Sequence, residues 1–265
     1  MFESRSCAVC TGLLAITVSG AAAQADTRPE RVDYLTFASG AIPVAISGRG
    51  AQLGANWEHA VRIVDGDPTF FPIVSRADST TDTEFVYELP ASTTFDRFAV
   101  PEIRETPSPS QTFTRRVEIC GSATAADAGF TLLAAGSLTT HAARGQVTEL
   151  TMAATIPVRW VKVRLIGGIA LLRPQMFLEF GEIIGNGAQQ TPALSDRFEG
   201  IWRGRGVLVQ LRQEGAAVAG CYDRTGDLTG TVTGNILRAT GVARSTDVPS
   251  AFVLSITADG ALRGV

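Results

Sequence analysis

The segment from Val161 to Leu165 alternates between apolar and charged side chains, and this period of two limits the chain to strands. Successive side chains of a strand point to opposite faces, so such alternation is typical of a half-buried strand. The same pattern occurs at Phe85–Leu89 and Arg116–Ile119, and glycine, proline, serine and threonine clusters separate these segments. No amphipathic helix longer than about three turns is indicated. The sequence therefore predicts an all-β protein, built as a sandwich or barrel of antiparallel strands.

A polar, proline-punctuated segment at 186–197 divides the chain, and we place a linker at 187–197. Before it, 26–186 is long enough for one sandwich. After it, 198–265 has glycine at nearly every turn and five short strand patterns, which predicts an antiparallel β-meander or barrel. These patterns lie at 208–211, 217–222, 228–232, 236–241 and 251–256.

The end of the sequence also predicts a strand. Asp259-Gly260 is a hairpin turn signal, and the return strand begins at Leu262, three residues before the last position. We expect an incomplete sheet that continues in a longer protein, or else an edge strand that needs no partner.

The first 25 residues have the form of a secretory signal peptide. Arg5 supplies the positive charge, 12–18 form the apolar segment, and Ala23-Gln24-Ala25 is a small-x-small cleavage site. An uncleaved membrane anchor is the alternative, but the apolar segment is short for a bilayer, and no later segment offers about 18 uninterrupted apolar residues. We expect a bacterial Sec-type signal, and a periplasmic, outer-membrane-associated or secreted protein without a transmembrane span.

Composition and motifs argue against several functions. The net charge of −3 provides no basic excess for nucleic acid. The two histidines, His59 and His141, belong to no zinc motif, and neither a nucleophile elbow nor a phosphate loop occurs, so we expect no enzyme.

Cleavage of the signal peptide would remove Cys7 and Cys10. An oxidising compartment would permit a disulfide between Cys120 and Cys221, and two separate thiols are the alternative.

The first module resembles the discoidin (coagulation-factor type C) domains, over about residues 32–186. Ala60 to Asp67, with its Asp-Gly-Asp end, followed by Thr69-Phe70-Phe71, is similar to their early signature, although Phe71 replaces the usual tryptophan. Later segments resemble their middle and closing strands in the same order; these are 85–89, 117–122, 159–163 and 180–185. The resemblance implies a galactose-binding-like jelly-roll sandwich. The second module opens with Phe198-x-Gly200-x-Trp202 and continues with 220–222 and 227–234. In these segments it is similar to glycine-rich meanders of bacterial outer-membrane-protein-A-like envelope proteins.

The resemblance also implies a structural Ca²⁺ site. Alternation from Leu178 to Ile184 places Glu182 on an apolar face, where a buried carboxylate needs an arginine, backbone donors or a cation. Family members of the sugar-binding type hold calcium between the Asp-Gly-Asp loop and a closing-strand glutamate. The matching positions here are Asp65, Asp67, Thr69 and Glu182. The alternative is a turn aspartate with a Glu182–Arg62 pair.

Sugar-binding members of the family also use loop aromatics as platforms for sugar rings. The matching candidates are Trp57, Phe70 and Phe71 with His59, and Arg49 and Arg76 could supply donors; ordinary core packing is the alternative for the aromatics. We therefore expect an exported, non-catalytic module that binds carbohydrate or another envelope component. The alternative is a structural or assembly protein of the envelope with no small ligand.

Overall fold

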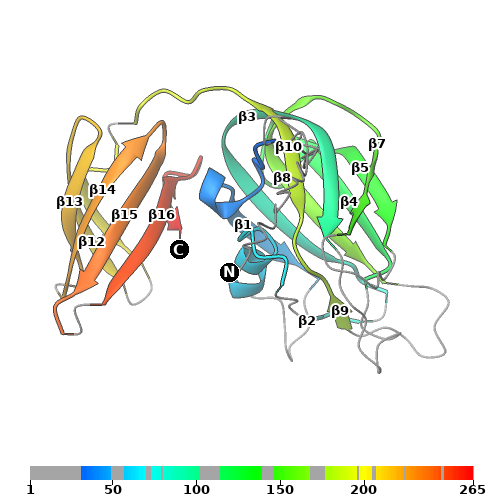
Figure 1. The fold of residues 1–265 in the computed structure, drawn as a ribbon, viewed down its shortest axis with the longest axis horizontal. Helices are drawn as coiled ribbons and strands as arrows, with labels where there is room; N and C mark the ends of the chain where they lie inside the picture. The colour runs from blue at the N-terminus through cyan, green and yellow to red at the C-terminus, as the bar shows by residue number, and fades with distance from the viewer. Residues whose placement is uncertain are drawn as a thin grey trace, which may run out of the picture. The chain divides into compact units, whose positions relative to one another are not determined.

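The computed structural model describes residues 31–48, 57–69, 73–78, 80–101, 114–138, 146–167, 177–195, 197–204, 207–223, 225–245 and 248–264. Almost all regular structure in these ranges is β, in an N-terminal sandwich-like sheet and a C-terminal antiparallel sheet (Figure 1). The predicted all-β class is confirmed. The predicted signal peptide at 1–25 lies outside the described residues, which include no helix long and apolar enough to cross a membrane.

The N-terminal sheet is organised around one long strand, β3 (Thr83–Pro101). Its strand order is β1-β3-β8-β4-β5-β7, and β10 and β6 also pair with β3. The bounds are β1 (Ile42–Ser47), β4 (Arg116–Ser122), β5 (Thr131–Ser137), β6 (Val147–Glu149), β7 (Thr151–Met152), β8 (Pro157–Ile166) and β10 (Ile184–Gln189). Outside this sheet lie η1 (Phe37–Ser39), α1 (Trp57–Arg62) and a two-stranded sheet of β2 (Ile73–Ser75) and β9 (Phe177–Glu179).

The two halves of β3 have different neighbours. Residues 83–88 pair with β1 and β8, whereas 93–101 pair mainly with β10 and β6. The β3–β8 register shifts between Glu88 and Thr93, and Pro90, which has no backbone N–H to donate, lies within this interruption. A single strand thereby carries pairings on either side of an irregularity, as expected where a sheet bends into a sandwich.

The sandwich core consists mainly of aromatic and β-branched side chains. The largest fully buried ones include Phe85, Tyr87, Phe95, Phe98 and Phe180. The predicted face of β3, Phe85, Tyr87 and Leu89, is buried, but Val86 and Glu88 are buried as well, so both faces of β3 are covered there. In β8 the predicted alternation is confirmed, because Val161, Val163 and Leu165 are buried and the charged residues between them are partly exposed.

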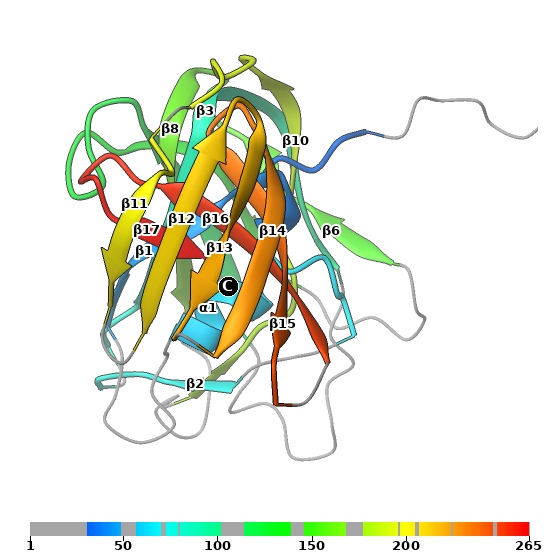
Figure 2. The same ribbon diagram turned by 90° about the vertical axis from the view of Figure 1, so that its left-hand side faces the viewer.

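The C-terminal sheet is a meander in which every strand pairs with its neighbour in sequence (Figure 2). Its strands are β11 (Gly200–Arg203), β12 (Leu208–Glu214), β13 (Ala217–Tyr222), β14 (Gly226–Thr233), β15 (Ile236–Ala243), β16 (Pro249–Ile256) and β17 (Leu262–Gly264). The sheet curls into a nearly closed barrel. Gly215, Gly234 and Gly260 have positive φ at its hairpin turns, where only glycine is unstrained. The predicted meander and the predicted hairpin at Asp259-Gly260 are confirmed.

Cys120 lies in β4 and Cys221 in β13, and both are free cysteines in this structure. The structure offers no support for a disulfide between them, so their pairing stays a prediction.

Candidate functional site at the Asp65-Gly66-Asp67 turn

The turn after α1 is anchored to the segment that precedes β10. Ile63 and Val64 are buried, and the backbone N–H of Ile183 donates to the Ile63 carbonyl at 3.0 Å. Gly66 follows with a φ of +82°, which reverses the chain direction at a position where a side chain would be strained. The Asp-Gly-Asp turn and residues 182–183 are therefore neighbours, although more than 110 residues separate them in sequence.

Glu182 is the buried carboxylate at this junction, with 2% of its surface exposed. Its Oε2 accepts a hydrogen bond from the Gly66 N–H at 3.1 Å, while its Oε1 is buried and has no hydrogen-bond partner in the described structure. Burial raises the pKa of Glu182 to about 9, and repulsion from the Asp65 carboxylate adds to the shift. Both effects favour the protonated form of this side chain at neutral pH.

Three of the four predicted metal ligands, Asp65, Asp67 and Thr69, lie in one turn, where Asp65 Oδ1 accepts a hydrogen bond from the Asp67 N–H at 2.9 Å. Asp65 lies beside Glu182, close enough for the two carboxylates to interact. Asp67 instead accepts hydrogen bonds from the N–H and hydroxyl of Thr69, at 2.9 and 2.5 Å, within its own turn. Arg62, the predicted alternative partner of Glu182, forms an ion pair with Asp65 at 3.3 Å.

A calcium ion fits part of this arrangement. The Asp65–Glu182 pair offers carboxylate oxygens from two segments, and the unpartnered Oε1 of Glu182 is the kind of hard oxygen donor that Ca²⁺ prefers. No group of three or more acidic, histidine or cysteine side chains gathers as a metal site anywhere in the described ranges. Any ion at this position would therefore take its remaining ligands from backbone carbonyls and water.

Two further polar side chains at this junction were not predicted from the sequence. Asp33 accepts hydrogen bonds from the N–H groups of Leu35 and Gly185, both at 2.9 Å, and burial raises its pKa to about 6. The buried Tyr87 hydroxyl donates to the Ala60 carbonyl at 2.7 Å. The alternation in β3 signals that Tyr87 is buried and hence that its hydroxyl needs a partner. No sequence pattern singles out Asp33.

The predicted ligand-binding residues differ in their exposure, and some lie outside the described residues. Trp57, at the start of α1, has 50% of its surface exposed, so it is not a core residue. His59 in the same helix is partly buried, and burial lowers its pKa, which favours the neutral imidazole. Arg49 and Phe70 lie outside the described residues, as does Phe71.

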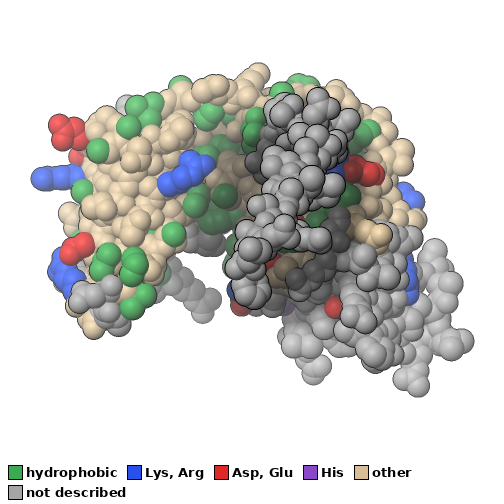
Figure 3. Space-filling view, viewed as in Figure 1, with side chains coloured by type: hydrophobic (Ala, Val, Ile, Leu, Met, Phe, Trp, Pro, Cys, Tyr) green, Lys and Arg blue, Asp and Glu red, His purple; other side chains and the backbone are tan. Residues whose placement is uncertain are grey.

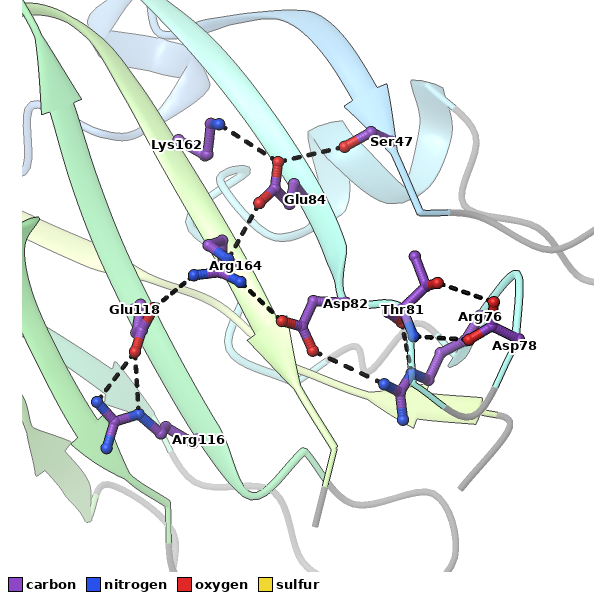
Figure 4. Close-up of polar contacts among 10 residues, drawn as sticks. All are labelled: Ser47, Arg76, Asp78, Thr81, Asp82, Glu84, Arg116, Glu118, Lys162 and Arg164. Carbon is purple, nitrogen blue, oxygen red and sulfur yellow. Dashed lines mark hydrogen bonds and ion pairs between the residues drawn. The ribbon is translucent and has the colours of Figure 1, made fainter. Parts of the chain in front are cut away.

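Arg76 does not belong to an exposed patch with Trp57. It is 4% exposed, its Nε donates to the Thr81 carbonyl at 2.8 Å, and its Nη2 lies 3.7 Å from Asp82 (Figure 4). Asp82 also pairs with Arg164 of β8 at 2.8 Å. The prediction that Arg76 supplies a ligand donor is not supported, because its guanidinium is used within the fold.

Arg164 is the centre of an ion-pair network on the outer face of β3, β8 and β4 (Figure 4). Besides Asp82, it contacts Glu84 at 3.0 Å and Glu118 at 2.8 Å, and Lys162 contacts Glu84 at 3.3 Å. The Asp82, Glu84 and Glu118 carboxylates raise the pKa of Arg164 against the opposing effect of burial. These strands thus present mutually paired charges rather than an aromatic platform.

Comparison with solved structures finds β-sandwich modules. The C-terminal domain of a chitobiase from Bacteroides fragilis has 10% identity and a TM-score of 0.45, and the match covers 61% of this chain and 99% of that one. A CBM32 module from a family 31 glycoside hydrolase of Clostridium perfringens has 12% identity and a TM-score of 0.40, covering 57% and 94%. A family 32 module from C. perfringens, solved in complex with galactose, has 15% identity and a TM-score of 0.36, covering 53% and 90%. No family model and no curated protein matches the sequence.

Proposed function

We propose that this chain is an exported, non-catalytic binding protein of a bacterial cell envelope, and that its sandwich recognises carbohydrate beside α1. The proposal rests chiefly on the exposure of Trp57, half of whose surface is accessible. A tryptophan is normally well buried, and an exposed indole offers a flat apolar face on which a sugar ring stacks.

The surroundings of Trp57 support this function. The helix that carries it is followed by the Asp65-Gly66-Asp67 turn, in which the Gly66 N–H donates a hydrogen bond to the Glu182 carboxylate. Hydrogen bonds from the Gly66 and Ile183 N–H groups anchor this end of the helix, and such anchoring would help to position the exposed ring before a ligand arrives. The export context of the proposal comes from the signal pattern of residues 1–25 and from nothing in the fold.

A glycan array with the full-length protein tests the proposal. We expect selective binding to a small set of glycans, and Trp57→Ala should weaken it by about tenfold or more, since stacking on the indole is lost. Ile201→Ala is the matched control, because Ile201 is a similarly exposed apolar side chain, 57% accessible, in β11 of the other sheet.

An array without any selective signal would refute carbohydrate recognition, as would equal effects of the two substitutions. Binding of Trp57 to an envelope protein instead, detected by crosslinking at this position, would favour the alternative of a structural or assembly role.

We further propose that Ca²⁺ binds between Asp65 and Glu182 and pins the turn. The unpartnered, buried Oε1 of Glu182 supports this, because a cation would satisfy it and offset the repulsion between the two carboxylates. Added Ca²⁺ should raise the melting temperature and EDTA should lower it again. Glu182→Gln should abolish this response, whereas Asp78→Asn, in an exposed turn elsewhere, should preserve it. A melting temperature that does not depend on Ca²⁺ would refute the metal site.

A further inference from the structure

The C-terminal sheet lines a cavity of about 590 Å³ that is open to solvent on one side. Both its first strand, β11, and its last, β17, contribute to the wall, so the sheet curls around the space. The large apolar side chains that line it are Trp202, Val207, Val209, Tyr222, Leu228, Phe252, Leu254 and Leu262. A volume of this size is typical of pockets that hold small molecules.

Part of the space inside the curled sheet is filled by a hydrophobic core, and the rest is the cavity. Phe198, Leu211, Val218 and Leu237 belong to a buried cluster that forms the ordinary core. Of the cavity's apolar side chains, Leu228 belongs to this cluster and Val207 is exposed. The other six pack against the cluster and are only partly buried. Hydrophobic side chains also reach the surface over the part of the molecule that holds this sheet (Figure 3, left-hand side). Apolar surface left accessible around a concave space favours the binding of an apolar occupant.

Two glycines allow aromatic rings of the cavity wall to pack directly against the backbone. A Cβ atom added at Gly226 would lie 2.1 Å from Cζ of Tyr222, and one added at Gly241 would lie 2.5 Å from Cε2 of Phe252. The two rings therefore lie directly against backbone, with centroids 5.7 Å apart and planes inclined by 54°. The indole N–H of Trp202 donates to the Phe198 carbonyl at 2.9 Å, which fixes the third ring. The wall is thus formed before any ligand binds.

The polar side chains of the cavity are few, and two of their polar atoms already have hydrogen-bond partners within the fold. The Trp202 N–H is occupied by Phe198, and the Asp223 carboxylate accepts a hydrogen bond from the Leu208 N–H at 2.8 Å. Arg203 and Asp223 contribute one charge of each sign, so neither anions nor cations are favoured. This chemistry differs from that of the Trp57 region and suits an apolar ligand with few polar atoms.

We propose that this cavity is a binding site for a small, uncharged, ring-containing apolar molecule, which lies against Trp202, Tyr222 and Phe252. Aromatic walls at inclined angles favour a flat ring over a flexible chain, because the ring can make stacked and edge-on contacts together. The site is independent of the carbohydrate function proposed for the sandwich.

Titration with N-phenyl-1-naphthylamine, an uncharged fluorescent probe, tests the site in the full-length protein. We expect saturable binding of one probe per chain, with energy transfer from tryptophan that Trp202→Phe strongly reduces. Ala261→Phe places a ring into the cavity and should weaken binding by about tenfold or more. Ala251→Phe adds the same ring at an exposed position of β16 outside the cavity and should leave binding within about twofold.

Circular dichroism verifies that each variant is folded, and Val209→Phe replaces Ala261→Phe as the blocking variant if the latter is not. Absence of saturable binding, or equal effects of Ala261→Phe and Ala251→Phe, would overturn the proposal. Tighter binding of an acyl-chain probe such as cis-parinaric acid would overturn the preference for rings. If light scattering shows that two chains associate through this cavity and exclude the probe, a second copy is the occupant. Trp57→Ala should not change probe binding, which separates this site from the proposed glycan site.

Discussion

Replacing Glu182 by glutamine should change how the stability of the protein depends on pH. In the folded protein the pKa of Glu182 is raised from its ordinary value of 4.5 to about 9, chiefly by burial. At pH 7 the unfolded chain is ionised at this position whereas the folded chain binds a proton. The free energy of unfolding therefore falls as pH rises through this interval, by about 1.4 kcal/mol for each pH unit.

The expected magnitude follows from the interval between the two pKa values. From pH 4.5 to pH 7 the wild type should lose about 3 kcal/mol, and from pH 7 to pH 8.5 about 2 kcal/mol more. Glutamine has a similar shape, and its carbonyl oxygen can still accept the Gly66 N–H while its amide donates toward Asp65. Glu182→Gln should thus be more stable than the wild type by about 3 kcal/mol at pH 7 and equal to it near pH 4.

Urea unfolding in EDTA, at intervals from pH 4 to pH 8.5, measures this difference. The range above pH 7 isolates Glu182, because the raised pKa of Asp33 is about 6 and the pKa of His59 is lowered below its ordinary 6.5. Glu58→Gln, at an exposed position of α1, is the control and should follow the wild type. If the wild type and Glu182→Gln change in parallel between pH 7 and pH 8.5, the carboxyl group is ionised in the fold and the reasoning is wrong.

Two further substitutions test other features of the sandwich. Gly187→Ala should destabilise it by about 1–3 kcal/mol in urea unfolding, because the new Cβ would lie 2.1 Å from the Thr94 carbonyl oxygen. Gly204→Ala is the control and should be far milder, because its new Cβ would come no closer than 3.8 Å, to the Val207 carbonyl oxygen; equal losses would contradict the clash. Asp33→Asn keeps an oxygen that can accept the Gly185 N–H, but the new side chain cannot ionise. Above pH 6 the variant should therefore be more stable than the wild type by up to about 3 kcal/mol. A stability difference that does not vanish near pH 3.8 would argue against this cause.

The strands were largely predictable from the sequence because local patterns determine them. The five strand patterns after residue 198 all correspond to strands, and 217–222 matches β13 in both bounds. Each of these strands pairs with its sequence neighbours, so turn residues and alternation suffice. The length of β3 was not predictable, because Pro90 signals an interruption within a strand that continues to Pro101.

The candidate site was only partly predictable, because its chemistry depends on contacts between distant segments. The burial of Glu182 is confirmed, but the strand alternation from which it was predicted does not exist. Residues 180–183 form no strand, and Phe180, Gly181 and Glu182 are all buried, so no alternation exists there. Arg76 pairs with Asp82 in the fold, and a sequence does not show which acidic residue an arginine will meet.

The order of strands in the two sheets has a consequence for how the chain folds. In the C-terminal sheet each pairing joins consecutive strands through a short connection, so contacts can form one hairpin at a time. The N-terminal sheet must first bring β3 and β8, which begin more than 70 residues apart, into register. Closing such long loops slows folding, and the sandwich should therefore be the slower module. We expect two kinetic phases in refolding, the faster one reported by Trp202 and the slower one by Trp160.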